Sequence, residues 1–389
     1  FSGIQLSNQD TAGKMISFDH YNKVLNVEYT RDGALVEVQS GIQLRDLCIY
    51  LEGLNLSFVN LGATATQSLA GATGMLKCFH FVCCMSYIVY VVYTVATGTH
   101  GTGLSLGNLA SQIRALRMID SRGNIILADT NTNKELYDAA RVGLGAVGII
   151  STMTIHVVPL WKMHVYPVHM SLSDVLLGDT LSRMLTQYAR IQWSFQVYTS
   201  DVTFTIREDV DNDTPLYPPG VDGGCWSQNN TYSTPEGCID VSYKTMTDSY
   251  INYEKRTLYT EMEMMIPTEH TIDAINDYIV YMDSIRSQHN EDIYVSVMVR
   301  YVAGDDIYLS PMFGRDTSVI SLIVLGDKEV TGNQDEFYRY ASGLQQLCQE
   351  KYQGRPHWGK VNYMLTDTET GSRTDSYLAR AYPDTWKRF

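Results

Sequence analysis

The chain has 389 residues, of which 44% are hydrophobic and 19% are charged, and its formal net charge at pH 7 is −14. This length and composition are typical of a globular protein with room for two domains, each with its own core, and they exclude a disordered chain. The acidic balance argues against nucleic acid or an anionic membrane surface as the main partner, because both attract basic patches.

Two β-hairpins are predicted in the first 160 residues. The first joins residues 24–30 to 34–41 across an Arg-Asp-Gly turn, and Asp-Gly between apolar runs is a strong hairpin signal. The second joins residues 113–120 to 124–129 across a Ser-Arg-Gly turn. This part of the chain is therefore expected to be rich in antiparallel β-structure.

Two helices are predicted in the same region. Residues 42–54 carry apolar side chains at helical spacing and should end their helix at Gly53; the residues are Leu44, Leu47, Cys48 and Leu51. Residues 133–159 are expected to begin as a helix and to continue through a turn of small residues into a β-branched strand.

The character of the sequence changes near residue 160. Long polar helices, predicted at 174–191 and 270–285, alternate with strands predicted at 296–302 and 318–326. The segment 334–360 is predicted to be a helix that runs into a Gly-Arg-Pro turn. Such alternation is typical of an α+β domain whose helices cover one face of a mostly antiparallel sheet.

The seven cysteines are too few for a disulfide scaffold, and they show no C-x2-C zinc pattern. No metal site is therefore predicted. Cys225 and Cys238 flank a polar loop in which a disulfide is sterically plausible.

An uncharged, apolar run extends from Cys78 to Ile113 and contains no Asp, Glu, Lys or Arg. Its densest part, residues 81–96, is about 16 residues long, which is short of the roughly 20 that a membrane-spanning helix needs. A span would also separate parts of one β-rich domain. We interpret roughly residues 75–94 as an insertion, for instance a translated intron.

The segment Thr97–Gly103, with the sequence TGTHGTG, is rich in glycine and hydroxyl groups. Glycine permits positive φ and close backbone approach, and threonine hydroxyls with free N–H groups suit a phosphate or a flat heterocycle. The segment lacks the G-x-G-x-x-G order of a Rossmann fingerprint and the Gly-Lys-Ser/Thr of a P-loop. Taken alone, it is equally well interpreted as an ordinary tight turn.

Further motifs accompany this loop in a fixed order: QSLAGA before it, then LGAVGIIS, CIDVSYK, EMEMMIP, VRYVAGDDIYLSP and RPHWGK. Together they resemble the FAD-linked sugar-lactone oxidases of the vanillyl-alcohol-oxidase superfamily, which include the gulonolactone and arabinonolactone oxidases. The resemblance covers nearly the whole chain. It implies FAD as cofactor, a sugar-1,4-lactone as substrate, and hydride transfer in the synthesis of ascorbate or an analogue.

The resemblance also implies an α+β, two-domain FAD-binding fold of the PCMH type. Residues 1–160 would form the FAD-binding domain, without its N-terminal part and with the insertion near 75–94. Residues 161–345 would form the α+β substrate (cap) domain. Residues 346–389 would return to the interface between flavin and substrate.

Site residues follow from the same motifs. Lys360, with His357 beside it, would stabilise negative charge on the reduced flavin, and Arg300 would bind the lactone oxygens. Without the family context Lys360 would be a solvated lysine, His357 a packing residue next to Trp358, and Arg300 an exposed sheet residue. The residues expected to hold FAD are Gly71, Thr97, Gly98, Thr99, His100, Gly101, Gly103, Gly148, Ile149 and Ile150.

Two departures from the family pattern leave alternatives open. Met298 stands where the family has the glutamate of a Glu-x-Arg pair, and methionine cannot accept a proton. The G-x-G-H-S segment, whose histidine binds FAD covalently in many members, would precede Phe1. A non-catalytic member and an alditol oxidase acting on open-chain polyols are the alternatives. The resemblance leaves the electron acceptor as oxygen or cytochrome c, and it implies association with a mitochondrial or endoplasmic-reticulum membrane.

Overall fold

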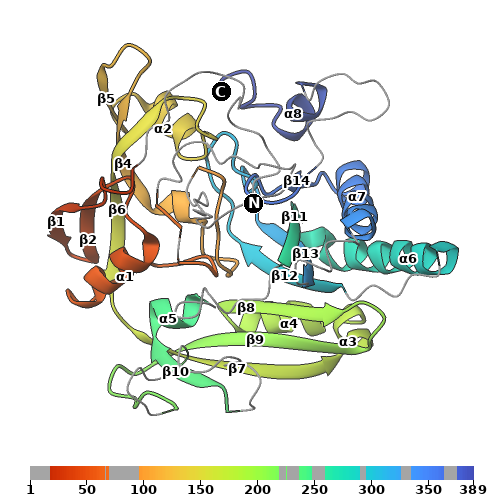
Figure 1. Cartoon of the computed structure of the whole chain (residues 1–389). Coiled ribbons are helices and arrows are strands. Elements are labelled where there is room, and N and C mark those ends of the chain that lie inside the picture. Colours follow the sequence, from red (N-terminus) through yellow and green to blue (C-terminus); the bar gives the residue numbers. More distant parts are fainter. Residues whose placement is uncertain are drawn as a thin grey trace, which may run out of the picture.

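The computed structural model describes residues 18–65, 67–69, 96–218, 225, 236–247, 259–289, 295–325, 334–362 and 375–389. Two antiparallel sheets dominate this part of the chain (Figure 1). Gly71 and the insertion predicted at 75–94 lie outside the described residues. None of the helices in the described part is long and apolar enough to cross a bilayer.

The first sheet has six strands among the described residues, in the order β1-β2-β6-β4-β5, with β3 paired to β6. The two predicted hairpins are confirmed, since β1 pairs with β2 and β4 pairs with β5. The strand bounds are β1 Val24–Thr30, β2 Gly33–Gln39, β3 Leu56–Ser57, β4 Ile113–Ile119, β5 Ile125–Asp129 and β6 Ile149–Pro159.

Short helices accompany this sheet: α1 (Leu44–Glu52), the 3-10 helix η1 (Leu109–Gln112) and α2 (Lys134–Ala140). The predicted helix that ends at Gly53 is confirmed, and all four of its predicted apolar residues are buried. The prediction for 133–159 is also confirmed, because α2 is followed by a turn and then by β6.

The second sheet has eight strands among the described residues, in the order β10-β7-β9-β8-β12-β13-β11-β14, and its recorded pairings are all antiparallel. The strand bounds are β7 Lys162–Ser171, β8 Arg190–Gln196, β9 Asp201–Val210, β10 Cys238–Val241, β11 Tyr259–Pro267, β12 Ser296–Val302, β13 Thr317–Leu325 and β14 Arg355–Pro356.

Helices lie against this sheet and at its ends, with α6 and α7 packed beside β11 and β13 (Figure 1). Their bounds are α3 Leu172–Leu176, α4 Thr180–Gln187, α5 Ser242–Met246, η4 Thr268–His270, α6 Thr271–His289, α7 Gln334–Lys351 and α8 Asp375–Ala381. The predicted helix at 174–191 is wrong. Gly178 adopts a φ of 72°, which separates α3 from α4, and the end of the predicted helix is the start of β8.

The two faces of the second sheet differ in chemistry because side chains alternate along each strand. On β12, Val297, Val299 and Tyr301 are fully buried in one hydrophobic cluster with residues of α6 and α7. Met298 and Arg300 therefore point to the opposite face. The face that carries Arg300 is the one that borders the first sheet's loops.

Cys225 and Cys238 form a disulfide, with Cα atoms 5.2 Å apart, so the predicted pairing is confirmed. Both cysteines are buried against Val165 of β7. The bond thus ties Cys225 to the edge of the second sheet, where β10 pairs with β7.

Candidate functional site

The loop Thr97–Gly103 is attached to the second sheet. The Gly103 N–H donates to the carbonyl of Tyr301 at 2.6 Å, and the Thr102 hydroxyl accepts from the Tyr301 N–H at 3.3 Å. The same hydroxyl donates to the carbonyl of Ile191 on β8. Gly98 and Gly103 adopt φ values of 82° and 141°, which favour glycine. The loop therefore lies against the β8–β12 pair.

A second loop, Asn60–Ala63, packs closely on the first. A Cβ atom at Gly101 would lie 2.1 Å from Oδ1 of Asn60, and one at Gly62 would lie 2.8 Å from Cγ2 of Thr99. In this structure Gly62 and Gly101 allow the two loops to approach each other. The two loops together make one continuous wall.

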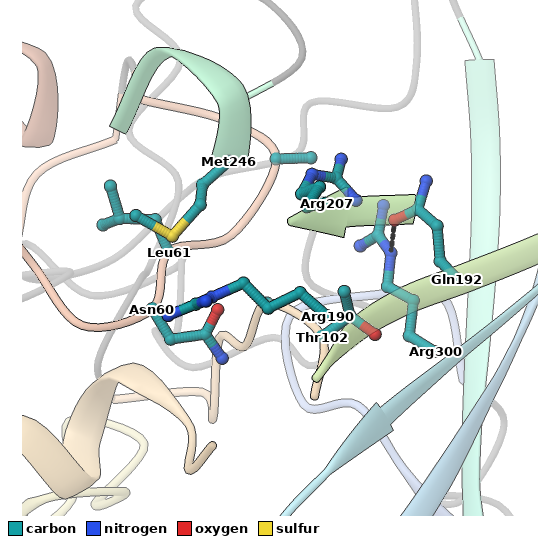
Figure 2. A pocket seen from close by; sticks show the side chains of 10 residues that line it. Asn60, Leu61, Thr102, Arg190, Gln192, Arg207, Met246 and Arg300 are labelled. Carbon is teal, nitrogen blue, oxygen red and sulfur yellow. Dashed lines mark hydrogen bonds between the residues drawn. The ribbon is translucent and has the colours of Figure 1, made fainter. Parts of the chain in front are cut away.

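Between this wall and the second sheet lies a small pocket, with a cavity volume of about 10 Å³. Its sheet side carries arginine and glutamine side chains, and the Nε of Arg300 donates to Oε1 of Gln192 at 3.3 Å (Figure 2). The residues that line the pocket are Asn60, Leu61, Ala63, Gly101, Thr102, Arg190, Gln192, Arg207, Met246 and Arg300. Arg300 and the glycine loop are far apart in the sequence, and the structure brings them together at this pocket.

The donor groups of this pocket fit the pyrimidine edge of a flavin. That edge carries nitrogen and carbonyl oxygen acceptors, and it becomes more electron-rich on reduction, so cationic and amide donors stabilise it. The pocket offers guanidinium groups and the Gln192 amide on one side and the buried Gly101–Thr102 backbone on the other. The chemistry of these groups is therefore compatible with the cofactor expected from the sequence.

Lys360 lies next to two buried glutamates on β11. Its ammonium group pairs with the carboxylate of Glu261 and lies 3.9 Å from Oε1 of Glu263. Burial raises the pKa of Glu261 despite the neighbouring Lys360. Burial also opposes ionisation of Glu263, but Lys360, His357 and His100 together outweigh it and hold the pKa of Glu263 well below its usual range. Lys360 is thus a fixed cation in a partly buried ion pair.

Two histidines contact the other side of Glu263. Nε2 of His100 lies 3.4 Å from Oε2 of Glu263, and Nε2 of His357 lies 3.8 Å from the same oxygen. Nδ1 of His357 accepts from the Gly359 N–H at 2.9 Å, so its proton is on Nε2, facing the carboxylate. Burial lowers the pKa of His357 to about 3, which leaves the ring neutral.

The ligand atoms of His100, Glu263 and His357 all lie within 4.8 Å of one another, a spacing that would also suit a metal ion. Nδ1 of His100 is 2.9 Å from the carbonyl of Gly101 and therefore carries a hydrogen. The Gly359 amide occupies Nδ1 of His357. The ring nitrogens and the Glu263 carboxylate thus have hydrogen-bond partners without a metal ion. We interpret the three residues as a buried network that connects the glycine loop to β11. The expectation of no metal stays a prediction.

The predicted residues Gly148–Ile150 lie at the start of β6 in the first sheet, where Ile149 and Ile150 pair with Ile119 and Met118. They do not line the pocket. The preceding turn is joined to the glycine loop, because the Leu144 N–H donates to the carbonyl of Ala96 at 3.2 Å.

Several polar residues of this site were not predicted: Gln192, Arg190, Arg207, Glu261 and Glu263. A signal was available for the two glutamates, because they alternate with the methionines of EMEMMIP and so share one face of a strand. The two arginines lie on β8 and β9, where pairing brings Arg190 opposite Arg207. That register could not be derived from either segment alone.

Comparisons with known proteins identify relatives of this chain. A family model described as D-arabinono-1,4-lactone oxidase matches residues 167–389, more than half of the chain. An L-gulono-1,4-lactone dehydrogenase of Mycobacterium tuberculosis is 28% identical, covering 97% of this chain and 81% of that protein. The L-gulonolactone oxidase of Bos taurus is also 28% identical, covering 90% and 77%.

Among solved structures, the cholesterol oxidase of B. sterolicum matches with a TM-score of 0.67 at 13% identity, covering 96% of this chain and 82% of that one. At this level of identity the likeness shows the fold. The α+β, FAD-binding fold of the PCMH type that the sequence predicted is confirmed.

Proposed function

The chain belongs to the D-arabinono-1,4-lactone oxidase family. On that premise we propose that it oxidises a sugar-1,4-lactone at the pocket beneath the glycine loop, which Arg300 lines, with Lys360 and His357 acting from beside it. The protein is a FAD-dependent oxidoreductase that acts on CH–OH groups. Its substrates are sugar lactones. FAD, when bound, accepts the hydride that leaves the sugar carbon.

The observation that carries this proposal is the position of Arg300. Its guanidinium lines the pocket opposite Gly101 and Thr102, and its hydrogen bond with Gln192 fixes its direction. A guanidinium next to the reacting hydroxyl binds the oxygen and favours the loss of its proton, because it stabilises the developing negative charge. The same group orients the lactone so that its C–H bond is held in one direction.

Lys360 supplies a second fixed positive charge. Glu261 and Glu263 hold its ammonium group, and Glu263 in turn contacts His100 of the glycine loop. The negative charge left by hydride transfer is stabilised by such a preorganised cation. His357 is neutral and contacts the same carboxylate, so its role is to position Glu263 and, through it, Lys360.

The electron acceptor is proposed to be oxygen or cytochrome c, and the protein is proposed to associate with a mitochondrial or endoplasmic-reticulum membrane. The loops Asn60–Ala63 and Thr97–Gly103, with the turn before Gly148, are proposed to hold FAD. Gly71, predicted to take part, lies outside the described residues.

The test is anaerobic mixing of the FAD-loaded protein with L-gulono-1,4-lactone or D-arabinono-1,4-lactone, while flavin bleaching is followed by stopped flow. We expect reduction by a lactone, and Arg300→Ala should slow it by about 10²-fold or more. Reoxidation of the reduced protein by oxygen or by cytochrome c then identifies the acceptor. Reduction by an open-chain polyol and by neither lactone would contradict the proposal.

A further inference from the structure

An acceptor sequence for N-linked glycosylation follows the end of β9, and the proposed function does not use it. Residues 212–214 are Asn-Asp-Thr, an Asn-x-Ser/Thr sequon whose middle residue is not proline. The Thr214 N–H donates to the carbonyl of Asp211 at 2.9 Å, so Asn212 and Asp213 are the two central residues of a turn. Both are exposed. The asparagine therefore lies on a surface turn, where the fold can carry a bulky glycan.

The turn does not depend on both hydrogens of the Asn212 amide. Nδ2 of Asn212 donates to the carbonyl of Leu160 at 3.5 Å, which is longer than an ordinary hydrogen bond. A glycosylated amide nitrogen keeps one hydrogen, so this contact can remain. The Thr214 carbonyl accepts from Nζ of Lys162 at 2.7 Å, which holds the turn through its backbone. A glycan on Asn212 is thus compatible with the local structure.

A disulfide at the same edge of the second sheet indicates an oxidising compartment (Figure 1). The segment after the turn pairs with β10, since Tyr217 and Ile239 exchange two backbone hydrogen bonds, of 3.0 and 2.8 Å. The neighbour of Ile239 is Cys238, which is bonded to Cys225, and both cysteines are buried. Structural disulfides form and persist in the secretory pathway and are rare where glutathione keeps thiols reduced. The sequon and the disulfide are therefore independent observations that indicate the same compartment.

The chain contains two further sequons, and neither carries the inference. Residues 55–57 are Asn-Leu-Ser, but Ser57 is buried and its hydroxyl accepts from the hydroxyl of Ser242 at 2.8 Å. Residues 229–231 are Asn-Asn-Thr and lie outside the described residues. Asn212 is thus the acceptor that the structure supports.

We propose that Asn212 carries an N-linked oligosaccharide, and that the protein therefore lies in the lumen of the endoplasmic reticulum. The donor is an oligosaccharide linked through pyrophosphate to a polyprenyl lipid. In the transfer, Nδ2 of Asn212 forms a bond to C1 of the first sugar and gives one proton to a base of the transferase. The bond between C1 and the pyrophosphate oxygen breaks, and the lipid pyrophosphate leaves with the electron pair. No group is oxidised or reduced in this step.

The compartment also selects between the two proposed electron acceptors, and this consequence, unlike the glycan, rests on the proposed function. Cytochrome c is confined to mitochondria, whereas oxygen diffuses into the lumen. A lumenal protein therefore passes the electrons of its substrate to oxygen.

One tryptic peptide reports on both the sequon and the disulfide. Residues 208–244 contain no Lys or Arg before Lys244, so trypsin releases Asn212, Cys225 and Cys238 together. The protein is isolated from its source and digested without reduction, and the peptide is treated with peptide-N-glycosidase F in heavy-oxygen water. Tandem mass spectrometry should find Asn212 converted to an aspartate that contains one heavy oxygen. The cysteines should react with iodoacetamide only after reduction, and the same incubation without glycosidase controls for spontaneous deamidation.

Variants of the complete gene, expressed in cells of the source, test the sequon itself. Asn212→Gln and Thr214→Val each remove the acceptor sequence, and each should cost the protein the mass of one glycan. Thr214→Ser is the matched control, because it keeps the hydroxyl and should keep the glycan. Both Thr214 variants retain the backbone carbonyl that Lys162 binds, so the turn is the same in the two proteins.

An unmodified Asn212 in the wild-type protein would overturn the inference, whether or not the disulfide is present. A glycan retained at Asn212 in Thr214→Val would overturn it as well, since the modification would not then follow the sequon. If Asn212 carries the glycan and no lactone reduces the flavin, the inference stands and the proposed function fails.

Discussion

At the scale of single residues, His357 makes stability depend on pH. Its ring is buried and neutral in the fold, with a pKa lowered from 6.5 to about 3. Below about pH 6.5 this histidine therefore binds a proton in the unfolded chain but not in the folded protein. The contribution of neutral His357 to the free energy of unfolding is therefore complete above pH 6.5. It decreases as the pH falls toward 3, by about 1.4 kcal/mol per pH unit.

The variant His357→Asn tests this dependence, because its side-chain oxygen can still accept from the Gly359 N–H that bonds Nδ1. We expect the free energy of unfolding of wild type relative to the variant to fall by about 2–3 kcal/mol over the two pH units below 6.5. Urea unfolding at a series of pH values measures it. The exposed His169→Asn serves as control, and a difference independent of pH would contradict the argument.

The resemblance predicts that Met298 occupies the position of a carboxylate in the family. It lies opposite Ser194 on β8 and Ser321 on β13, and the Ser321 hydroxyl donates to Glu263 at 3.2 Å. A carboxylate at 298 would share a face with Arg300 and could accept the proton of the reacting hydroxyl. We therefore expect Met298→Glu to speed flavin reduction by lactone about tenfold or more.

The matched control is Met298→Gln, which has a similar shape and cannot take the proton. Stopped-flow measurement of flavin reduction in both variants separates the effect of the carboxylate from the effect of side-chain shape. An equal rate for the glutamate and glutamine variants would show that the charge at 298 does not take part.

The residues of this site differed in how far the sequence could reveal them. Arg300, Lys360 and His357 stand in motifs that could be identified by resemblance. Arg190 and Arg207 belong to no such motif, and they become neighbours only through the register of β8 with β9. Register depends on contacts across strands, which periodicity within one strand does not contain.

At the scale of elements, the sequence predicted correctly those turns and helices that depend on residues close together in the chain. The Asp-Gly turn produced the β1–β2 hairpin, and the apolar spacing of α1 produced a helix that ends at Gly53. The prediction of one helix over 174–191 was wrong because it gave no weight to Gly178, and because β8 begins with residues that also suit a helix.

One side chain joins η1 of the first part of the molecule to the second part. Oδ1 of Asn108 accepts from the Ser111 N–H at 2.9 Å and caps η1, while its Nδ2 donates to Asp305 at 2.8 Å. Burial raises the pKa of Asp305 to about 6, so this carboxylate depends on its donors. We expect Asn108→Ala to lower the free energy of unfolding by about 2–4 kcal/mol, the loss of a cap and of a hydrogen bond to a charged group.

Thermal or urea unfolding of Asn108→Ala measures this loss. The control is Asn124→Ala, which removes an exposed amide that donates to Asp120 and should cost less than about 1 kcal/mol. Equal losses for the two variants would mean that Asn108 does not join the two parts.

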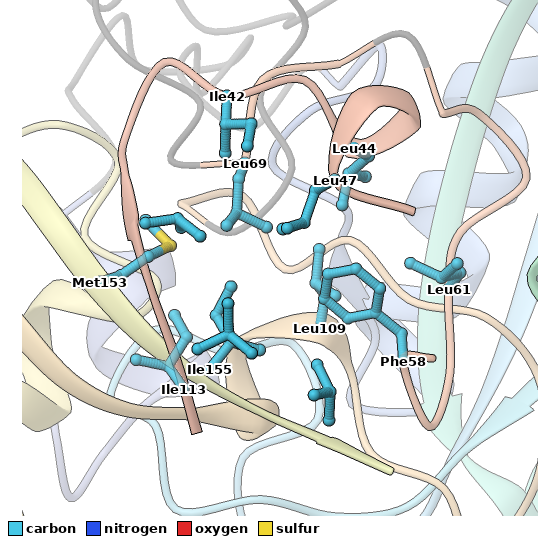
Figure 3. Close-up of a cluster of buried hydrophobic side chains, with 14 of the residues drawn as sticks. Ile42, Leu44, Leu47, Phe58, Leu61, Leu69, Leu109, Ile113, Met153 and Ile155 are labelled. Carbon is cyan, nitrogen blue, oxygen red and sulfur yellow. The ribbon is translucent and has the colours of Figure 1, made fainter. Parts of the chain in front are cut away.

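At the scale of the whole molecule, the core of the first sheet is not made by residues 1–160 alone. Its hydrophobic cluster contains Phe58, Leu109 and Ile155 from the first sheet and its loops (Figure 3). The same cluster contains residues from distant parts of the chain: Met163, Tyr243, Met246, Ile307, Leu309, Trp358, Leu378 and Tyr382. The sequence motifs predicted a FAD-binding domain at 1–160 and a return of residues 346–389 to the interface between flavin and substrate. They did not identify the side chains that share this core, since contacts between distant residues leave no local pattern.

Trp358 illustrates how much one distant residue contributes to the stability of this core. Its ring is buried and stacks on Tyr382, and its Nε1 donates to the carbonyl of Leu309 at 2.7 Å. Losing a buried tryptophan of this kind typically costs about 3–5 kcal/mol, a large part of the stability of a whole domain. A polypeptide that ends at residue 160 lacks this ring and the other distant members of the cluster.

We therefore predict that residues 1–160, produced alone, do not unfold cooperatively. The polypeptide should bind a hydrophobic dye such as ANS and show a broad thermal transition, as expected for a chain that keeps strands and loses fixed packing. Adding residues 161–389 as a separate polypeptide should restore a sharp transition and reduce dye binding, because it returns the missing members of the cluster. A sharp, dye-free transition of residues 1–160 by themselves would show that the first sheet holds an independent core.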